Sequence, residues 1–410
     1  MKFDFSVLIQ KTIWLMTVFL LASFIMFDTN QYISVILLGV TIVILILDSI
    51  DNGYKVKFKF GAFHVWGLLF ATFCLLSSLW AINLQASLSK GITIIQIMIC
   101  MSVLYNYYSK QDNFINLLSA IEYAGYMAAI YTVSFYGIGY IKNSFIAASR
   151  LDSEFANVNS IGMACAISIV LCVYHALYKG NRKIIKLPLV ALALIIVAAT
   201  ASRKALLIIV FGGMCLYLFK YASKNILKTI LKWVVIMAVL IAIFIIMSQF
   251  QMFGVLNKRM AGLLALFEGT GAIDHSTWLR QQYIKIGLEQ FLETPFLGIG
   301  IDNARLLLMQ HFGYTTYLHN NYVELLASVG LAGTGLFYSI YGYLLNKLRK
   351  NWRYYGSEAI AALILILIQL AMDFALVSYY SKTTFFYLMT YCVITKYGYT
   401  YSKDKQRSIR

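Results

Sequence analysis

The sequence predicts an all-α polytopic membrane protein with about 12 transmembrane helices, and three observations support this fold class. Of the 410 residues, 60% are hydrophobic and only 12% are charged, and the mean hydropathy is +0.74. A soluble protein of this length could not bury so much apolar surface, so the bilayer must solvate most of the chain. The apolar residues also fall into runs of roughly 20, the length that crosses a bilayer as a helix. Finally, basic residues concentrate in alternate connections between these runs.

The apolar runs between charged residues give the expected spans in chain order. Arg203 interrupts the run 184–222, so this run is either a pair of spans or a re-entrant element. The expected spans are 11–28, 32–48, 62–80, 91–108, 115–138, 159–178, 184–201, 204–222, 229–249, 321–346, 357–379 and 383–400.

The distribution of charge explains the net charge of +17 without a nucleic-acid partner. With the N-terminus in the cytoplasm, most of the 34 Lys and Arg residues fall in the inner connections and the two termini. This is the positive-inside pattern, and it predicts an even number of spans with both termini in the cytoplasm. The first span follows a short basic start without a small-residue cleavage site, so we interpret it as a retained helix and not as a removed signal peptide.

The chain reads as a single integral membrane domain over 1–410, because no internal repeat or low-complexity linker is evident. One long outer loop, 250–320, is inserted in it between the ninth and tenth spans. Apolar residues recur at helical spacing over 278–292, and Ser276 or Thr277 can cap a helix there. We therefore expect short amphipathic helices in this loop, lying on the membrane surface.

Turn and cap residues follow the first loop helix. Pro295 is expected to end that helix, and Gly298 and Gly300 to make a tight turn. Asp302 can then cap a second helix over 303–311.

The cysteines give no sign of a redox or metal site. All of them lie in apolar runs, where they act as small buried apolar residues, and their spacing matches neither a metal site nor a disulfide framework. We expect no cofactor. The six are Cys74, Cys100, Cys165, Cys172, Cys215 and Cys392.

Arg203 is the first candidate for chemistry, because it stands between two apolar runs. An arginine costs about 2.5–3.5 kcal/mol at the centre of a bilayer, and less at a helix end. It is therefore either a snorkelling charge at a helix end or an anion ligand. Ser202, Arg203 and the free backbone N–H groups of a helix N-terminus together suit a phosphate.

Other arginines fall on the same outer side. Arg280 lies near the start of the loop helix, and alone it would be read as a solvated charge. Together with Arg203, and with Arg150 or Arg259, it makes a shared anion pocket plausible. A guanidinium grips phosphate oxygens in a fixed fork and stays charged at any biological pH.

His319 stands at the boundary between the outer loop and the next span. A lone histidine is more often a hydrogen-bonded structural residue than a base. Here Asn320, Asn321 and Glu324 follow closely, and Glu324 lies about one helical turn on. A neutral imidazole could accept a proton from a sugar hydroxyl, and a neighbouring carboxylate or amide could orient it.

Two carboxylates and two glycines inside expected spans complete the candidates. Glu122 and Asp373 are either functional groups or satisfied interhelical hydrogen-bond partners, and we rank both below the arginines. Gly330 and Gly333 are expected to permit close helix packing.

Three motifs make the chain resemble the O-antigen ligase/Wzy polymerase superfamily of bacterial membrane proteins. They are His-Asn-x9-Gly-x-x-Gly over 319–333, Thr-Ala-Ser-Arg over 200–203, and Arg280 followed by Thr-Pro-Phe-Leu-Gly-Ile-Gly ending at Gly300. The first pattern is fairly specific when it follows a long outer loop near the last three spans. The similarity covers roughly 200–335, and the rest agrees only in hydropathy and number of spans.

The resemblance implies a C-type glycosyltransferase-like architecture and a metal-independent reaction on the outer face of the bacterial cytoplasmic membrane. The donor would be an oligosaccharide on undecaprenyl diphosphate. Arg203 and Arg280 would bind the diphosphate, His319 would serve the acceptor hydroxyl, and Arg150 is a looser match for the same cavity. Besides that donor, the implied partners are membrane lipids and the chain-length regulator and flippase of the same pathway.

The resemblance leaves three functions open. A polysaccharide polymerase would join repeat units of an O-antigen or capsule, and we favour it because nothing in the loop suggests a protein acceptor. An O-antigen ligase would transfer the glycan to lipid A-core or another acceptor. A flippase or other transporter is the non-enzyme alternative, but the internal repeat that transporters often show is not evident.

Overall fold

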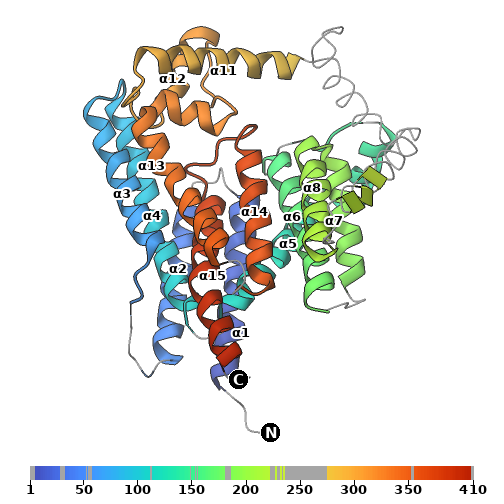
Figure 1. Ribbon diagram of the computed structural model, residues 1–410. Coiled ribbons are helices and arrows are strands. Elements are labelled where there is room, and N and C mark those ends of the chain that lie inside the picture. The colour runs from blue at the N-terminus through green and yellow to red at the C-terminus, as the bar shows by residue number, and fades with distance from the viewer. Residues whose placement is uncertain are drawn as a thin grey trace. The chain divides into compact units, whose positions relative to one another are not determined.

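The computed structural model contains only helices in the part of the chain that it describes (Figure 1). Six of these helices are long and apolar enough to cross a membrane, and α7 and α14 are shorter apolar helices. The protein is therefore a membrane protein that is all-helical over the described residues, whereas the number of 12 spans stays a prediction. The described residues are 5–27, 33–51, 53, 58–110, 113–147, 149–152, 154, 156–180, 186–221, 227–228, 231–232, 234–235, 275–351 and 355–407.

Each expected span overlaps a described helix except 229–249, most of which lies outside the described residues. The helices are α1 Phe5–Met26, α2 Ile33–Asp51, α3 Ala62–Leu76, α4 Leu84–Tyr108, α5 Asn116–Ile146, α6 Val158–Tyr178, α7 Leu187–Thr200, α8 Arg203–Tyr221, α11 His275–Glu293, α12 Ala304–Phe312, α13 Asn321–Asn351, α14 Ser357–Met372 and α15 Lys382–Arg407, with 3-10 turns at Ser77–Leu79 and Asn113–Ile115.

The chain divides into two compact units. The first comprises Met1–Ile9, Leu37–Leu117 and His275–Arg410, and the second comprises Gln10–Ile36 and Leu118–Asp274. The first unit therefore holds α11 to α15, and the second holds α5 to α8. The organisation as one membrane domain with an inserted loop stays a prediction.

Aromatic side chains from three helices form the centre of the first unit. Trp66 of α3 packs on Phe337 of α13 and Phe385 of α15, with ring centroids 6.0 and 5.6 Å away. Its indole N–H donates to the carbonyl of Leu336 at 3.0 Å, which satisfies the one polar group of this buried ring. These contacts fix α13, and thereby the segment that precedes it, on the rest of the unit.

Gly330 interrupts α13, and the backbone around this break forms hydrogen bonds with the outer loop. Its φ of 61° and ψ of −164° are non-helical, so the neighbouring backbone N–H groups lose their helical partners. The N–H of Leu331 instead donates to the carbonyl of Pro295 at 2.8 Å, and Ile299 N–H donates to the Ala327 carbonyl at 3.2 Å. Gly333 does permit helix packing as expected, because a Cβ there would meet Phe73 of α3.

The loop helices form where the sequence predicts them, but two of the expected caps are wrong. The helix predicted over 278–292 is α11, which already begins at His275, so Ser276 and Thr277 lie inside it. The helix predicted over 303–311 is α12, whose N-cap residue is Asn303 and not Asp302. Figure 1 shows α11 and α12 together at one end of α13.

In the second unit, α6 packs against α7 and α8. The interrupted run 184–222 forms two helices, α7 and α8, separated by a left-handed turn at Ala201 (φ 45°). The buried carboxylate of Glu122 accepts a hydrogen bond from Lys186 Nζ at 2.7 Å and pairs with His175 Nδ1 at 2.6 Å. Of the two interpretations of Glu122 from the sequence, this contact pattern fits the satisfied interhelical hydrogen-bond partner.

The expected span 357–379 is too long. Helix α14 ends at Met372, and Asp373 is its C-cap, not a residue inside a helix. The physical reason is the cluster of donors around its buried carboxylate: Ser378 and Tyr338 hydroxyls donate at 2.7 and 2.8 Å, and the Asn321 amide at 3.3 Å. All six cysteines are free thiols, and all but the half-buried Cys172 are buried.

Candidate active site

His319 lies between α12 and α13 in an unusual backbone conformation. Its φ is 58°, the left-handed region that residues other than glycine seldom adopt. The half-buried imidazole stacks on the ring of Tyr283 with centroids 6.0 Å apart and planes 14° apart, and it contacts the ring of Tyr317 at 4.2 Å. The histidine is thus held between aromatic rings at the surface of the loop.

Arg280 shares this location. It is half-buried on α11, three residues before Tyr283, so the two side chains lie on the same face of the helix. The guanidinium is close enough to Tyr283 to act on it electrostatically. Burial and the 2.6 Å hydrogen bond to the Tyr314 hydroxyl raise the pKa of Tyr283 to about 12, so its hydroxyl stays protonated at physiological pH.

Asn320 and Glu324 both make local structural contacts. Asn320 Oδ1 accepts from Val323 N–H at 3.1 Å, which caps the first turn of α13. Glu324 is 1% exposed, and its Oε2 accepts from the backbone N–H of Leu318 at 2.7 Å. The carboxylate therefore holds the backbone just before His319. A role of either residue in substrate binding stays a prediction.

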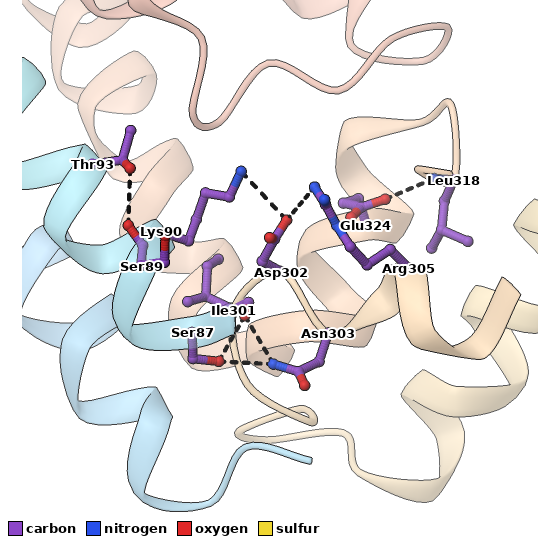
Figure 2. Close-up of polar contacts among 10 residues, drawn as sticks. All are labelled: Ser87, Ser89, Lys90, Thr93, Ile301, Asp302, Asn303, Arg305, Leu318 and Glu324. Atoms are coloured by element: carbon purple, nitrogen blue, oxygen red, sulfur yellow. Dashed lines mark hydrogen bonds and ion pairs between the residues drawn. The ribbon is translucent and has the colours of Figure 1, made fainter. Parts of the chain in front are cut away.

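A charged cluster that the sequence did not single out lies next to these residues (Figure 2). The carboxylate of Asp302 pairs with Arg305 Nη2 at 2.6 Å and with Lys90 Nζ at 3.5 Å. Burial raises the pKa of the Asp302 carboxyl, while Lys90 and Arg305 oppose this shift. The Lys90 ammonium also lies 3.9 Å from the ring centroid of Tyr380. The only sequence signal was a lone lysine just before the span 91–108.

Hydrogen bonds of the Ser87 and Asn303 side chains fix the turn that carries Asp302. Ser87 Oγ donates to the Ile301 carbonyl at 2.7 Å, and Asn303 Nδ2 donates to Ser87 Oγ at 2.7 Å (Figure 2). Asn83 N–H donates to Asn303 Oδ1 at 2.7 Å. The turn after Pro-Phe-Leu-Gly-Ile-Gly is therefore anchored on the start of α4.

The second unit brings together three of the predicted residues. Arg203 is the first residue of α8, and Ser202 directly precedes it with a buried hydroxyl that has no hydrogen-bond partner among the described residues. Arg150 comes close to this turn, because the N–H of the next residue, Leu151, donates to the Ala199 carbonyl at the end of α7. A buried hydroxyl directly before a helix that begins with an arginine suits an anionic ligand.

The predicted residues thus form two groups. Arg280, Asn320, Glu324 and His319 lie in the first unit, and Arg150, Ser202 and Arg203 lie in the second. Arg259 lies outside the described residues. Among the residues that the structure describes, no group of three His, Cys, Asp or Glu side chains could hold a metal ion.

Residues 188–338 match the model of a family described as O-antigen ligase. This stretch of the chain is therefore similar to the O-antigen ligase family. The matched stretch begins in α7 and ends in α13, so it includes Arg203, Arg280 and His319, and it supports the resemblance that the three motifs indicated. No curated protein matches the chain significantly.

Proposed function

We propose that the protein is a polysaccharide polymerase that joins oligosaccharide repeat units carried on undecaprenyl diphosphate. The reaction takes place on the outer face of the cytoplasmic membrane, with both chain termini in the cytoplasm, and it needs no metal. The pathway's flippase supplies the lipid-linked units, and a chain-length regulator is a further candidate partner.

The reaction is a glycosyl transfer by direct displacement. An acceptor sugar hydroxyl attacks the anomeric carbon of the donor sugar, its oxygen forms the new glycosidic bond, and its proton passes to the imidazole of His319. The bond from the anomeric carbon to the diphosphate oxygen breaks at the same time. Arg203 and Arg280 stabilise the negative charge on the departing undecaprenyl diphosphate, because fixed cations act most strongly where charge develops.

One observation carries this proposal. His319 lies just before the apolar helix α13 and stacks on Tyr283, which is one helical turn from Arg280 on α11. A base and a guanidinium on neighbouring elements are what an acceptor hydroxyl and a diphosphate leaving group require. The match of residues 188–338 to the O-antigen ligase family supports the same class of chemistry. Its description equally suits a ligase that transfers the glycan to lipid A-core, which is the second candidate.

The proposal is tested in a strain that lacks the gene and receives it back on a plasmid. Arg203→Ala, Arg280→Ala and His319→Ala should each leave normal amounts of protein in the membrane but reduce chain formation about 10²- to 10⁴-fold. His311→Ala is the matched control, since His311 is an exposed histidine on α12. A normal ladder of chain lengths from all three variants would refute the proposed site.

The deletion strain itself separates the two candidate functions. Surface glycan with a single repeat unit still attached to its acceptor indicates a polymerase. Lipid-linked polymer that accumulates with none attached to the acceptor indicates a ligase.

A further inference from the structure

The left-handed backbone at His319 needs support from its surroundings. Such a conformation is unfavourable for a residue with a side chain, and it persists only where neighbouring contacts enforce it. Those contacts come from Glu324, which bonds the backbone before the histidine, and from Asp373, which bonds the backbone after it.

On the N-terminal side, the support is Glu324. Its Oε2 accepts from Leu318 N–H at 2.7 Å, the peptide group directly before His319 (Figure 2). Leu318 itself is fully buried in a cluster with Tyr283, Val323 and other apolar residues of α11 to α13. Gly287 lets α11 approach this point, because a Cβ there would lie 2.5 Å from Leu318 Cδ1.

On the C-terminal side, the support is Asp373. The backbone N–H of Asn321 donates to the Asp373 carbonyl at 2.7 Å, and the Asn321 amide donates to its carboxylate at 3.3 Å. Asn321 Oδ1 in turn accepts from the backbone N–H groups of Ser378 and Tyr379 at 2.8 and 3.0 Å. Asp373 and Asn321 are both fully buried, so this network joins the start of α13 to the connection between α14 and α15.

We propose that Glu324 and Asp373 are positioning residues, which hold the backbone on either side of His319 so that its imidazole is presented on Tyr283 toward the acceptor. The inference rests on the proposed function of His319. It gives Glu324 a different role from direct contact with sugar, because the carboxylate is buried and already bonded to the backbone. It also gives Asp373 a role in the reaction although it touches no substrate.

Two conservative variants of Glu324 separate hydrogen bonding from charge. Glu324→Gln keeps an acceptor oxygen at the same distance along the side chain and removes the charge. Glu324→Asp keeps the charge but withdraws the acceptor from Leu318 by one methylene. Lys90, Asp302 and Arg305 act electrostatically on Glu324. If Glu324 acted through its charge, Glu324→Gln would therefore impair the reaction.

The experiment uses the purified full chain in proteoliposomes, with the lipid-linked repeat unit that the deletion strain accumulates as substrate. We expect Glu324→Asp to lower kcat by about 100-fold with KM within two-fold of the unmodified protein, because a displaced catalytic group slows the chemistry without weakening binding. Glu324→Gln should retain most of the kcat of the unmodified protein.

The role of Asp373 is tested through Tyr338. Tyr338→Phe removes one hydrogen-bond donor to the Asp373 carboxylate and should lower kcat severalfold at constant KM. Ser339→Ala is the control, because Ser339 is the next residue and is exposed.

The outcomes are distinct. A Glu324→Gln variant slower than Glu324→Asp, or a rise in KM at constant kcat, would overturn the positioning role in favour of charge or substrate contact. Loss of folded protein without a change in kcat of the remainder would show that the network is structural only. Normal activity of His319→Ala would instead refute the proposed function, whatever the Glu324 variants do.

Discussion

Gly330 is a residue whose backbone, not its side chain, decides the local structure. Its φ and ψ fall in a region that is open essentially to glycine alone. A Cβ at this position would lie 2.4 Å from the backbone of Phe296, and a Cβ at Gly298 would lie 2.5 Å from the backbone of Ser328. The two glycines therefore allow the loop and the broken helix to touch, backbone to backbone.

Gly330→Ala should accordingly reduce stability by at least about 1–3 kcal/mol, since the strain adds to a clash with backbone that cannot move aside easily. Gly335→Ala on the same helix is the control, because it has open space around it and should be neutral or slightly stabilising. Thermal unfolding of the two purified variants in detergent provides the measurement. Equal melting temperatures would contradict the assigned role of Gly330.

At this scale the motifs single out residues but not their partners. Arg280 and His319 stand out in the sequence because their residue types and the glycines that follow them are distinctive, and their roles stay predictions. The stacking of His319 on Tyr283 was not predicted, since it joins residues from two elements, and Tyr283 was read only as part of an apolar helix face. The bond from Glu324 to the Leu318 backbone was missed for a similar reason: spacing suggests proximity but not which atom a carboxylate binds.

Among the elements, α5, α6 and the start of α7 are held together by one buried charged group. Glu122 is fully buried, and its carboxylate contacts Lys186, His175 and the Tyr126 hydroxyl at 2.7, 2.6 and 3.3 Å. Buried charges persist only when they are paired and hydrogen-bonded. The cluster therefore fixes how these helices pack in the second unit.

Lys186→Met removes the cation and leaves the carboxylate under-compensated, which should destabilise the protein by about 3–5 kcal/mol. The double variant Glu122→Gln with Lys186→Met should recover much of that loss, because neither partner is then charged. Lys285→Met is the control, since its side chain is 70% exposed and its ion pair with Glu289 contributes little to stability. Melting temperatures in detergent decide the matter, and an unchanged value for Lys186→Met would contradict the role of the cluster.

The helices themselves were predictable because apolar runs of this length have few other structures open to them. Their ends were less predictable. The expected span 357–379 ran past the end of α14, because the apolar residues after Asp373 continue in a connection that Asn321 and Tyr338 hold in place. Hydropathy records the apolar character of such a segment but not the buried polar bonds that end the helix.

For the whole molecule, the distribution of basic residues predicts which side each connection faces. Single cysteines at Lys285 on α11 and at Lys350 at the end of α13 test this, since both positions are exposed. An impermeant maleimide should label Lys285→Cys on spheroplasts and Lys350→Cys only after permeabilisation. The unmodified chain is the control, because five of its six thiols are buried. The reverse labelling pattern would contradict an outward-facing site.

The backbone hydrogen bonds that join residues 295–299 to the break in α13 also affect the order in which the protein folds during synthesis. The loop leaves the ribosome before α13 does, so its Pro295 and Phe296 carbonyls have no partner until Leu331 and Ala332 have been synthesised and placed at the membrane. The segment around His319 lies in sequence between residues 295–299 and the break in α13, so it cannot reach its final structure before these hydrogen bonds form. We therefore expect the segment around His319 to assemble only after the tenth predicted span has been inserted.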